Sequence, residues 1–553
     1  MSLSQILFPS EPARITIKKR KPANSWLTDH SDNLQLPTPQ PTPSPSPPLP
    51  SSSSEASSSS QPLTSAQMLQ RKSTSQPPPA PTTYTPTPIL AHGHGLRMHV
   101  PPVSSASAPA PAKGILKQKE SLRKLIEENC PSLFEKFTSP WYLFNGHLQT
   151  LYNVVGDFSK EDHIVYRRTY LRLTDGGTLG LDFTPPDLDT LPEDTPIIVV
   201  NHGLTGGSHE AYIRAVLAPA CTPRSQGGLG YRAVVVNFRG CACVPITSQH
   251  LYTAGNTEDL RIALLYISQQ YPKAPLFGMG FSLGANVMVR YMAEEGDRSR
   301  LLSGCTMGCP WDLGENLTSI TSTIMGNIWT RGMGANMLTL VQRHAPSLSG
   351  NTRRVLEEGE VKNPLSPIFE GRNIVAGAVE KALALRFPTL DKFDHTFTRV
   401  IGGVAVDLGP KEYYTQNGSH RVLPHIRRPL LAINAVDDPI VQSFPKTVEE
   451  IDSEWTTMVL TPGGGHLGWL EPVAWDLTGV KRWTTKPALE WLEMCGEMFD
   501  VGLQMRRLTA HTKVTRDKEG FMREEGTDGL GCKKIEGGGI LDWSKMDISS
   551  KGF

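Results

Sequence analysis

A serine stands between two glycines in the stretch GFSLG at 280–284, after the apolar run PLFGM and before the helical pattern ANVMVRYMAEEG. A G-x-S-x-G sequence between a strand and a helix forms a sharp, strained turn that exposes the serine hydroxyl beyond the end of the strand. The backbone N–H of the next residue points into the same space. Ser282 is therefore a candidate nucleophile for acyl transfer. The alternative is a turn that needs its glycines and leaves the serine without a role.

A serine hydroxyl is a poor nucleophile at neutral pH, so it needs a general base and a carboxylate that orients the base. Two later strand-like runs end in suitable residues: LLAINAVDD supplies Asp437 and Asp438, and TMVLTPGGGH supplies His466. The order serine, acid, histidine is expected when each group follows a later strand of one sheet. We favour Asp438 as the acid, because an apolar Pro-Ile-Val return follows it. Asp437, which could cap the turn, remains the alternative.

The tetrahedral intermediate of acyl transfer also needs N–H donors for its oxyanion. The run PIIVVNHGL places Leu204 just past the end of a predicted central strand. We expect the backbone N–H groups of Leu204 and Leu283 to form this pair. His202 lies two residues before Leu204, and we expect it to brace the loop rather than to act as the base.

The elements that must position these residues read as an α/β fold. Short apolar runs alternate with helical stretches from PIIVVNHG to TMVLTPGGG, which predicts a mostly parallel central sheet with helices on both faces. A gap from about 312 to 427 is too long for a single crossover and has helical patterns of its own. We interpret it as an inserted helical cap. The run KPALEWLEMCGEMFDVGL predicts the closing helix.

Composition separates this folded region from two tails. Residues 1–112 are rich in Pro and Ser and predict a disordered tail, whereas residues 506–553 predict a loose, polar, Gly-rich one. The domain itself is expected over 113–505. Lys and Arg total 55 against 54 Asp and Glu, so the net charge of +1 gives no general attraction to nucleic acid. The chain has no apolar run of the length that spans a bilayer, and its 8 scattered cysteines fit a reducing compartment.

Two motifs suggest other chemistry. Cys241-x-Cys243 and the Cys305/Cys309 pair lack the spacing of zinc ligands and sit at apolar strand ends, so we expect no metal site. The glycines in GGGHLG at 463–468 match G-x-G-x-x-G, but a dinucleotide fingerprint belongs to the first strand–helix turn rather than to the last strand. We therefore expect no bound cofactor.

The chain resembles the α/β-hydrolases of the AB hydrolase-4 family over roughly 113–505. The motifs that carry the resemblance are SPWYLFNGHLQTLY, NHGLTGGSHEAYIR, VVVNFRGCACVPIT, YTAGNTEDLRIAL, GMGFSLGANVMVRY, NAVDDPIV and GGGHLGW. The resemblance implies an α/β-hydrolase fold, a triad of Ser282, His466 and Asp438, and acyl-ester or acyl-CoA substrates. Relatives often have a histidine where this chain has Thr253. None of the 15 histidines has an aspartate five positions later, so the H-x-x-x-x-D motif discussed for acyl transfer in some relatives is missing.

The sequence thus predicts a serine carboxylester hydrolase for short- to medium-chain acyl esters of the acylglycerol or ethyl ester type. An acyl-CoA:alcohol O-acyltransferase with the same triad is the first alternative. A catalytically inactive scaffold that binds SH3 or WW modules through its Pro-rich tail is the second. The expected location is cytoplasmic, with peripheral contact with lipid droplets or membranes left open.

Overall fold

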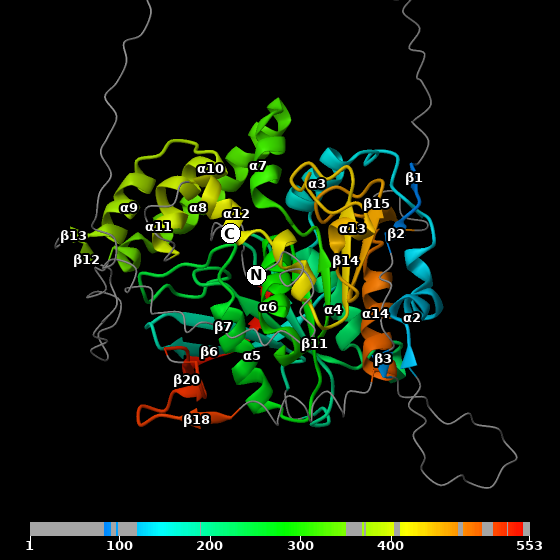
Figure 1. Ribbon diagram of the computed structural model, residues 1–553, viewed down its shortest axis with the longest axis horizontal. Coiled ribbons are helices and arrows are strands. Elements are labelled where there is room, and N and C mark those ends of the chain that lie inside the picture. Colours follow the sequence, from blue (N-terminus) through cyan, green and yellow to red (C-terminus); the bar gives the residue numbers. More distant parts are fainter. Residues whose placement is uncertain are drawn as a thin grey trace, which may run out of the picture. The chain divides into compact units, whose positions relative to one another are not determined.

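The computed structural model describes residues 82–89, 96–97, 119–187, 190–349, 368–369, 372–402, 410–473, 479–499, 513–527 and 529–545. The chain divides into two compact units, Met1–Ala80 and Pro81–Phe553, and every described residue belongs to the second. Figure 1 shows a central sheet with helices packed against it. No helix among the described residues is both long and apolar enough to cross a membrane.

Within the described residues the central sheet has the strand order β18-β19-β20-β6-β7-β9-β8-β10-β11-β14-β15-β2. Its middle is parallel from β9 to β15, and the strands on either side run antiparallel. The parallel strands are β8 (Ile197–Asn201), β9 (Arg232–Asn237), β10 (Leu276–Phe281), β11 (Leu301–Met307), β14 (Leu430–Ala435) and β15 (Thr456–Thr461). The antiparallel strands are β2 (Thr87–Ile89), β6 (Val165–Leu173), β7 (Thr178–Thr184), β18 (Val514–Arg516), β19 (Met522–Glu524) and β20 (Cys532–Asp542).

The side chains of each parallel strand contribute to two hydrophobic cores, one on each face of the sheet. Along β8, Ile197 and Val199 join one hydrophobic cluster, whereas Ile198 and Val200 join another, because successive side chains point to opposite faces of a sheet. Helices α5 (Glu258–Gln270) and α6 (Leu283–Glu295) contribute to the first cluster. The second contains residues of α2 (Leu122–Asn129), α4 (Ala211–Cys221) and α14 (Thr485–Met498). The predicted fold class, an α/β sheet covered on both faces, is confirmed.

The long gap between β11 and β14 is largely helical. Its elements pack on one another, with α8 contacting α7, α9 and α10 (Figure 1). They are α7 (Leu313–Thr321), α8 (Ile324–Leu348), β12 (Ile368–Phe369), β13 (Arg372–Asn373), α9 (Ile374–Leu383), α10 (Leu390–Phe393), the π-helix η6 (Asp394–Thr398), α11 (Arg399–Ile401), α12 (Pro410–Asn417) and η7 (His420–His425).

Short elements complete the described structure. The remaining helices are η2 (Pro131–Leu133), α3 (Gly146–Val155), η3 (Arg224–Gln226), η4 (Gly296–Arg298), α13 (Val448–Ile451) and η8 (Trp543–Lys545). The remaining strands are β1 (Thr83–Tyr84), β3 (Leu96–Arg97), β4 (Lys119–Glu120), β5 (Phe137–Thr138), β16 (Leu470–Pro472) and β17 (Val480–Arg482).

Both predicted tails contain segments that the structure places against the domain. Within 1–112, β2 pairs antiparallel with β15, and β1 pairs with β5. Within 506–553, β20 pairs with β6, and its register shifts between Ile535 and Gly539. Gly537, Gly538 and Gly539 have φ values of 98°, 85° and 122°, which favour glycine and form this irregularity. The pairing of β20 differs from the loose tail predicted by composition, because a glycine-rich, half-polar strand has the same composition as a loose segment. The pairings of β1 and β2 place ordered strands before residue 113.

Candidate active site

The turn between β10 and α6 holds Ser282 in a conformation that few L-residues adopt, with φ 50° and ψ −120°. Its glycine neighbours are required by close packing. A Cβ on Gly280 would lie 2.6 Å from the Cα of Ala285, and one on Gly284 would lie 2.4 Å from the carbonyl oxygens of Asn201 and His202. The strained turn therefore depends on both glycines, and it holds Ser282 half-buried at the end of the strand.

The structure brings Ser282, His466 and Asp438 into one hydrogen-bonded series. His466 Nε2 lies 2.8 Å from Ser282 Oγ, and His466 Nδ1 lies 2.8 Å from Asp438 Oδ2. His466 is 8% exposed and Asp438 is 2% exposed. A carboxylate at Nδ1 favours a proton on that nitrogen, which leaves Nε2 free to accept the serine proton.

The two neighbouring carboxylates have different partners. Asp438 Oδ1 accepts the N–H groups of Ile440 and Val441 at 2.7 and 2.8 Å, which leaves Oδ2 for the imidazole. Asp437 Oδ1 instead accepts the N–H of Gly465 at 2.9 Å. Burial raises the pKa of the Asp437 carboxyl to about 6. Asp438 therefore contacts the histidine ring, whereas Asp437 holds the backbone just before it.

The loop after β8 passes close to the nucleophile. A Cβ on Gly203 would lie 3.4 Å from the Cβ of Ser282. The N–H of Gly203 donates to Tyr212 Oη at 3.1 Å, and the N–H of Thr205 donates to Tyr252 Oη at 3.3 Å. Between them, the N–H of Leu204 has no hydrogen-bond acceptor within the described part of the chain.

Leu283 is the first residue of α6, so its N–H has no acceptor within the helix. Leu204 and Leu283 thus each offer one backbone donor on segments that adjoin Ser282.

His202 braces this loop from within. It is fully buried, and Nε2 accepts the N–H of Phe238 at 3.1 Å, so the ring proton resides on Nδ1 and is donated to Gly203 O at 2.7 Å. Burial lowers the pKa of His202 to about 4. A neutral ring with both nitrogens engaged suits a structural role and leaves no lone pair for base chemistry.

Comparison with known proteins identifies the family. Residues 196–473 match the family model described as alpha/beta hydrolase fold. A monoacylglycerol lipase of Saccharomyces cerevisiae is 30% identical over 68% of this chain and 84% of its own length. The chain belongs to the α/β-hydrolase family.

Two further relatives of this α/β-hydrolase carry related names. The medium-chain fatty acid ethyl ester synthase/esterase 2 of Saccharomyces cerevisiae is 28% identical over 65% of this chain and 85% of its own length. The human phospholipase ABHD3 is 26% identical over 64% of this chain and 78% of its own length. The family resemblance and the predicted enzyme class, a serine hydrolase, are both confirmed.

Helix α3 was not predicted to contribute to the site of this hydrolase. Its side chains bond the loop at 462–469 that carries His466, which we call the histidine loop. Thr150 Oγ1 accepts the N–H of His466 at 2.8 Å and donates to Gly146 O at 2.6 Å. Gln149 Oε1 accepts the N–H of Leu470 at 2.8 Å, and Asn153 Nδ2 donates to His466 O at 3.5 Å. Polar residues at 149, 150 and 153 share one helix face, and this spacing was the available sequence signal.

Thr150→Val tests this positioning role, because valine keeps the shape and removes the hydroxyl. The N–H of His466 then loses its acceptor inside the protein, which costs about 1–3 kcal/mol. We expect kcat for a soluble ester to fall about tenfold with KM little changed, and Thr150→Ser to restore most of it. The test is to measure kcat and KM separately for both variants. An equal loss of kcat in Thr150→Val and Thr150→Ser would contradict the role of the hydroxyl.

The residues of the two other motifs are packed inside the structure, except for Cys243, which is exposed. A Cβ on Gly463 would lie 2.0 Å from the Tyr84 ring, and one on Gly465 would lie 2.3 Å from Gly146 O. The glycines at 463–468 therefore let the histidine loop pack closely against its neighbours. Cys241, Cys305 and Cys309 are buried, and the described residues contain no group of three His, Cys, Asp or Glu side chains arranged to hold a metal.

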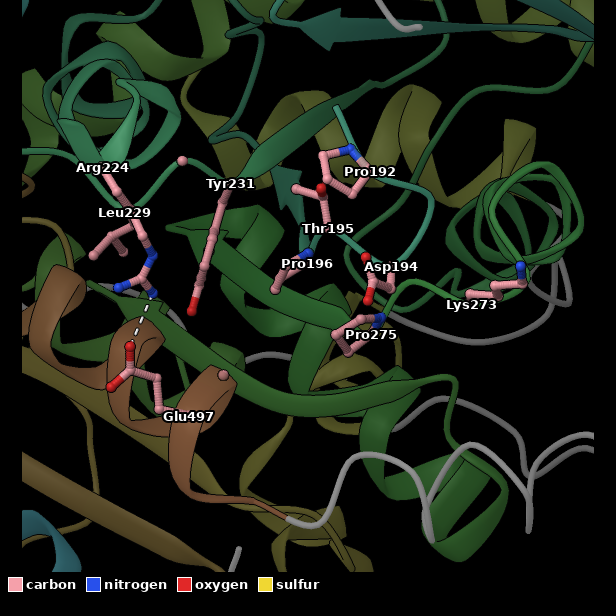
Figure 2. A pocket seen from close by; sticks show the side chains of 12 residues that line it. Pro192, Asp194, Thr195, Pro196, Arg224, Leu229, Tyr231, Lys273, Pro275 and Glu497 are labelled. Atoms are coloured by element: carbon pink, nitrogen blue, oxygen red, sulfur yellow. Dashed lines mark ion pairs between the residues drawn. The ribbon is translucent and has the colours of Figure 1, made fainter. Parts of the chain in front are cut away.

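A surface depression of about 480 Å³ lies at the other ends of the strands (Figure 2). Pro196, Tyr231 and Pro275, which line it, immediately precede β8, β9 and β10. Arg224 and Glu497 form a 2.9 Å ion pair at its edge, drawn as a dashed line in Figure 2. Because Ser282 follows the carboxyl end of β10, this depression is separate from the candidate active site.

Proposed function

We propose that this α/β-hydrolase is a serine carboxylester hydrolase that acts on short- to medium-chain acyl esters through an acyl-enzyme on Ser282. The observation that carries the proposal is the position of His466, 2.8 Å from both Ser282 Oγ and Asp438 Oδ2. The names of the relatives, a lipase, an ester synthase/esterase and a phospholipase, support an acyl ester as the substrate class.

The proposed reaction has two halves. Ser282 Oγ attacks the ester carbonyl carbon while its proton passes to His466 Nε2, and the oxyanion accepts the N–H groups of Leu204 and Leu283. The carbon–oxygen bond to the alcohol then breaks, and His466 returns the proton to the leaving alcohol. Water attacks the acyl-enzyme with His466 as its base, which releases the acid and regenerates the serine. Asp438 keeps its hydrogen bond to His466 Nδ1 and stabilises the imidazolium at both stages.

The test is a panel of soluble esters with graded acyl chains, combined with labelling by a fluorophosphonate probe. We expect one covalent adduct per chain on Ser282, and turnover that is highest for short to medium chains. A folded protein that neither reacts with the probe nor turns over any ester would contradict the proposal and favour the non-catalytic scaffold.

Alcohol transfer is the second candidate, and it is supported by the relative named an ethyl ester synthase/esterase. Water and alcohol would compete for the same acyl-enzyme, with His466 activating either one. Exclusion of water above the serine would favour the alcohol. Water is in large excess, so we propose hydrolysis as the main activity and transfer as a minor branch.

The ratio of products measures this partition. With a medium-chain acyl-CoA and increasing ethanol, we expect free acid to dominate at millimolar ethanol and ethyl ester to rise in proportion to ethanol. Ester in excess at low ethanol would reverse the ranking and make the protein a transferase first.

A further inference from the structure

Helix α3 is amphipathic in the inverse sense to an ordinary surface helix. Its buried side carries Gln149 and Thr150, which bond the histidine loop. Its exposed side carries Leu151, Val154 and Val155, the last of them 70% exposed. A surface helix normally turns its apolar stripe toward the core and its polar residues toward water. The exposed apolar stripe therefore has no explanation in the folding of the domain.

A second exposed apolar group joins this one from the helical insertion. Ile324, Met325 and Ile328 lie in the first turns of α8, and Ile324 is 84% exposed. Trp329 on the same helix donates to His147 of α3 at 3.0 Å, and the two rings stack. The beginning of α8 and the exposed side of α3 are thus connected by direct contact.

We name this surface the apolar rim and define it by Trp141, Phe144, Leu151, Val154, Val155, Ile324, Met325 and Ile328, all of them exposed. Trp141 is connected to α3 through ring contacts with Tyr142 and from Tyr142 to Tyr152, and Phe144 lies two residues before the helix begins. The apolar rim adjoins the active site, because α3 bonds the backbone of His466 through Thr150 and Asn153. Clustered exposed apolar residues of this kind mark interaction surfaces.

The charge pattern identifies the chemistry of the partner. Residues 137–156 and 316–330 contain no Asp, Glu, Lys or Arg, although charged residues make up 20% of the chain. A surface that binds anionic lipid headgroups carries clusters of Lys and Arg. The apolar rim is poor in charge, with Asp157 and Arg331 at its borders, and its Trp, Phe and aliphatic side chains instead fit the boundary between headgroups and acyl chains.

We infer that the apolar rim docks the enzyme on an electrically neutral lipid surface, which brings the active site over esters held in that surface. The purpose of this docking rests on the proposed function, because a hydrolase of acyl esters meets poorly soluble substrates at a lipid surface. The docking itself depends on the rim alone and is measurable in a protein without activity.

The experiment uses the full chain with Ser282→Ala and vesicles of pure phosphatidylcholine. We expect the protein to sediment with the vesicles to the same extent at low salt and in about 0.5 M NaCl, because apolar insertion is little screened. Adding Val154→Asp and Val155→Asp, or Ile324→Asp, should lower the partition coefficient about tenfold or more at unchanged Tm. Ile540→Asp is the matched control, since Ile540 is 57% exposed on β20, outside the apolar rim, and should leave binding unchanged.

Three results would overturn the inference. Rim variants that bind as well as the parent would show that other residues dock the protein. Binding that high salt abolishes would indicate an electrostatic surface. A dimer that the rim variants dissociate, with no vesicle binding in the parent, would assign the rim to a second copy of the chain. Turnover of a soluble butyrate ester by the unmodified enzyme tests the proposed function separately, so the two can fail independently.

Discussion

Ser282→Ala should lower kcat/KM for a soluble short-chain ester by about 10⁴-fold or more. Alanine removes the only atom that can form the acyl-enzyme, and His466 keeps its hydrogen bond to Asp438. The N–H groups of Leu204 and Leu283 also stay in place, so residual activity from oxyanion binding alone would remain small. The fold should persist, because alanine is as compatible as serine with the turn at φ 50°.

Two measurements separate loss of chemistry from loss of structure. The Tm of Ser282→Ala should equal that of the parent within a few degrees, and the fluorophosphonate adduct should vanish from its mass spectrum. Ser225→Ala is a suitable control, since Ser225 is exposed in η3, next to the depression at the other ends of the strands. Near-normal turnover in a Ser282→Ala protein with an unchanged Tm would refute the assignment of the nucleophile.

The part of the site that could be predicted is the part fixed by local sequence. The turn at Ser282 needs a glycine two residues before it and two residues after it, because the backbone is crowded there. The structure shows this crowding at Gly280 and Gly284. The parallel direction of the central strands could also be predicted, because buried strands are continuously apolar and the helices between them are not. Together they bring loops from distant parts of the chain to the carboxyl ends of the same sheet.

The remaining features depend on contacts that no local pattern specifies. Thr150 positions His466 across 316 residues of sequence, through a single hydroxyl on a helix that precedes every parallel strand of the sheet. Strand β20 pairs with β6 although its sequence, CKKIEGGGILD, is glycine-rich and half polar. The pairing there is between backbone groups of β20 and its two neighbours, β19 and β6, and backbone hydrogen bonds need few apolar side chains to form. Composition alone therefore misassigns it.

The choice between Asp437 and Asp438 yields the second large expected effect. Asp438→Asn should lower kcat by about 10³- to 10⁴-fold, as loss of the orienting carboxylate does in other triads. Asparagine can keep its Oδ1 on the N–H groups of Ile440 and Val441, so its amide nitrogen would face His466 Nδ1. An N–H at that place forces Nδ1 to accept and puts the ring proton on Nε2. The histidine is then in the wrong tautomer to take the proton from Ser282.

Asp437→Asn is the matched comparison, because it makes the same chemical change one residue away. Its Oδ1 would still accept the N–H of Gly465, and the contact that holds the histidine loop would survive. We expect kcat to change by less than about tenfold, on the scale of one altered hydrogen bond. The ratio of the two effects is more informative than either value, since general damage to the loop would lower both. A larger loss in Asp437→Asn than in Asp438→Asn, with both proteins folded, would transfer the role of the orienting carboxylate to Asp437.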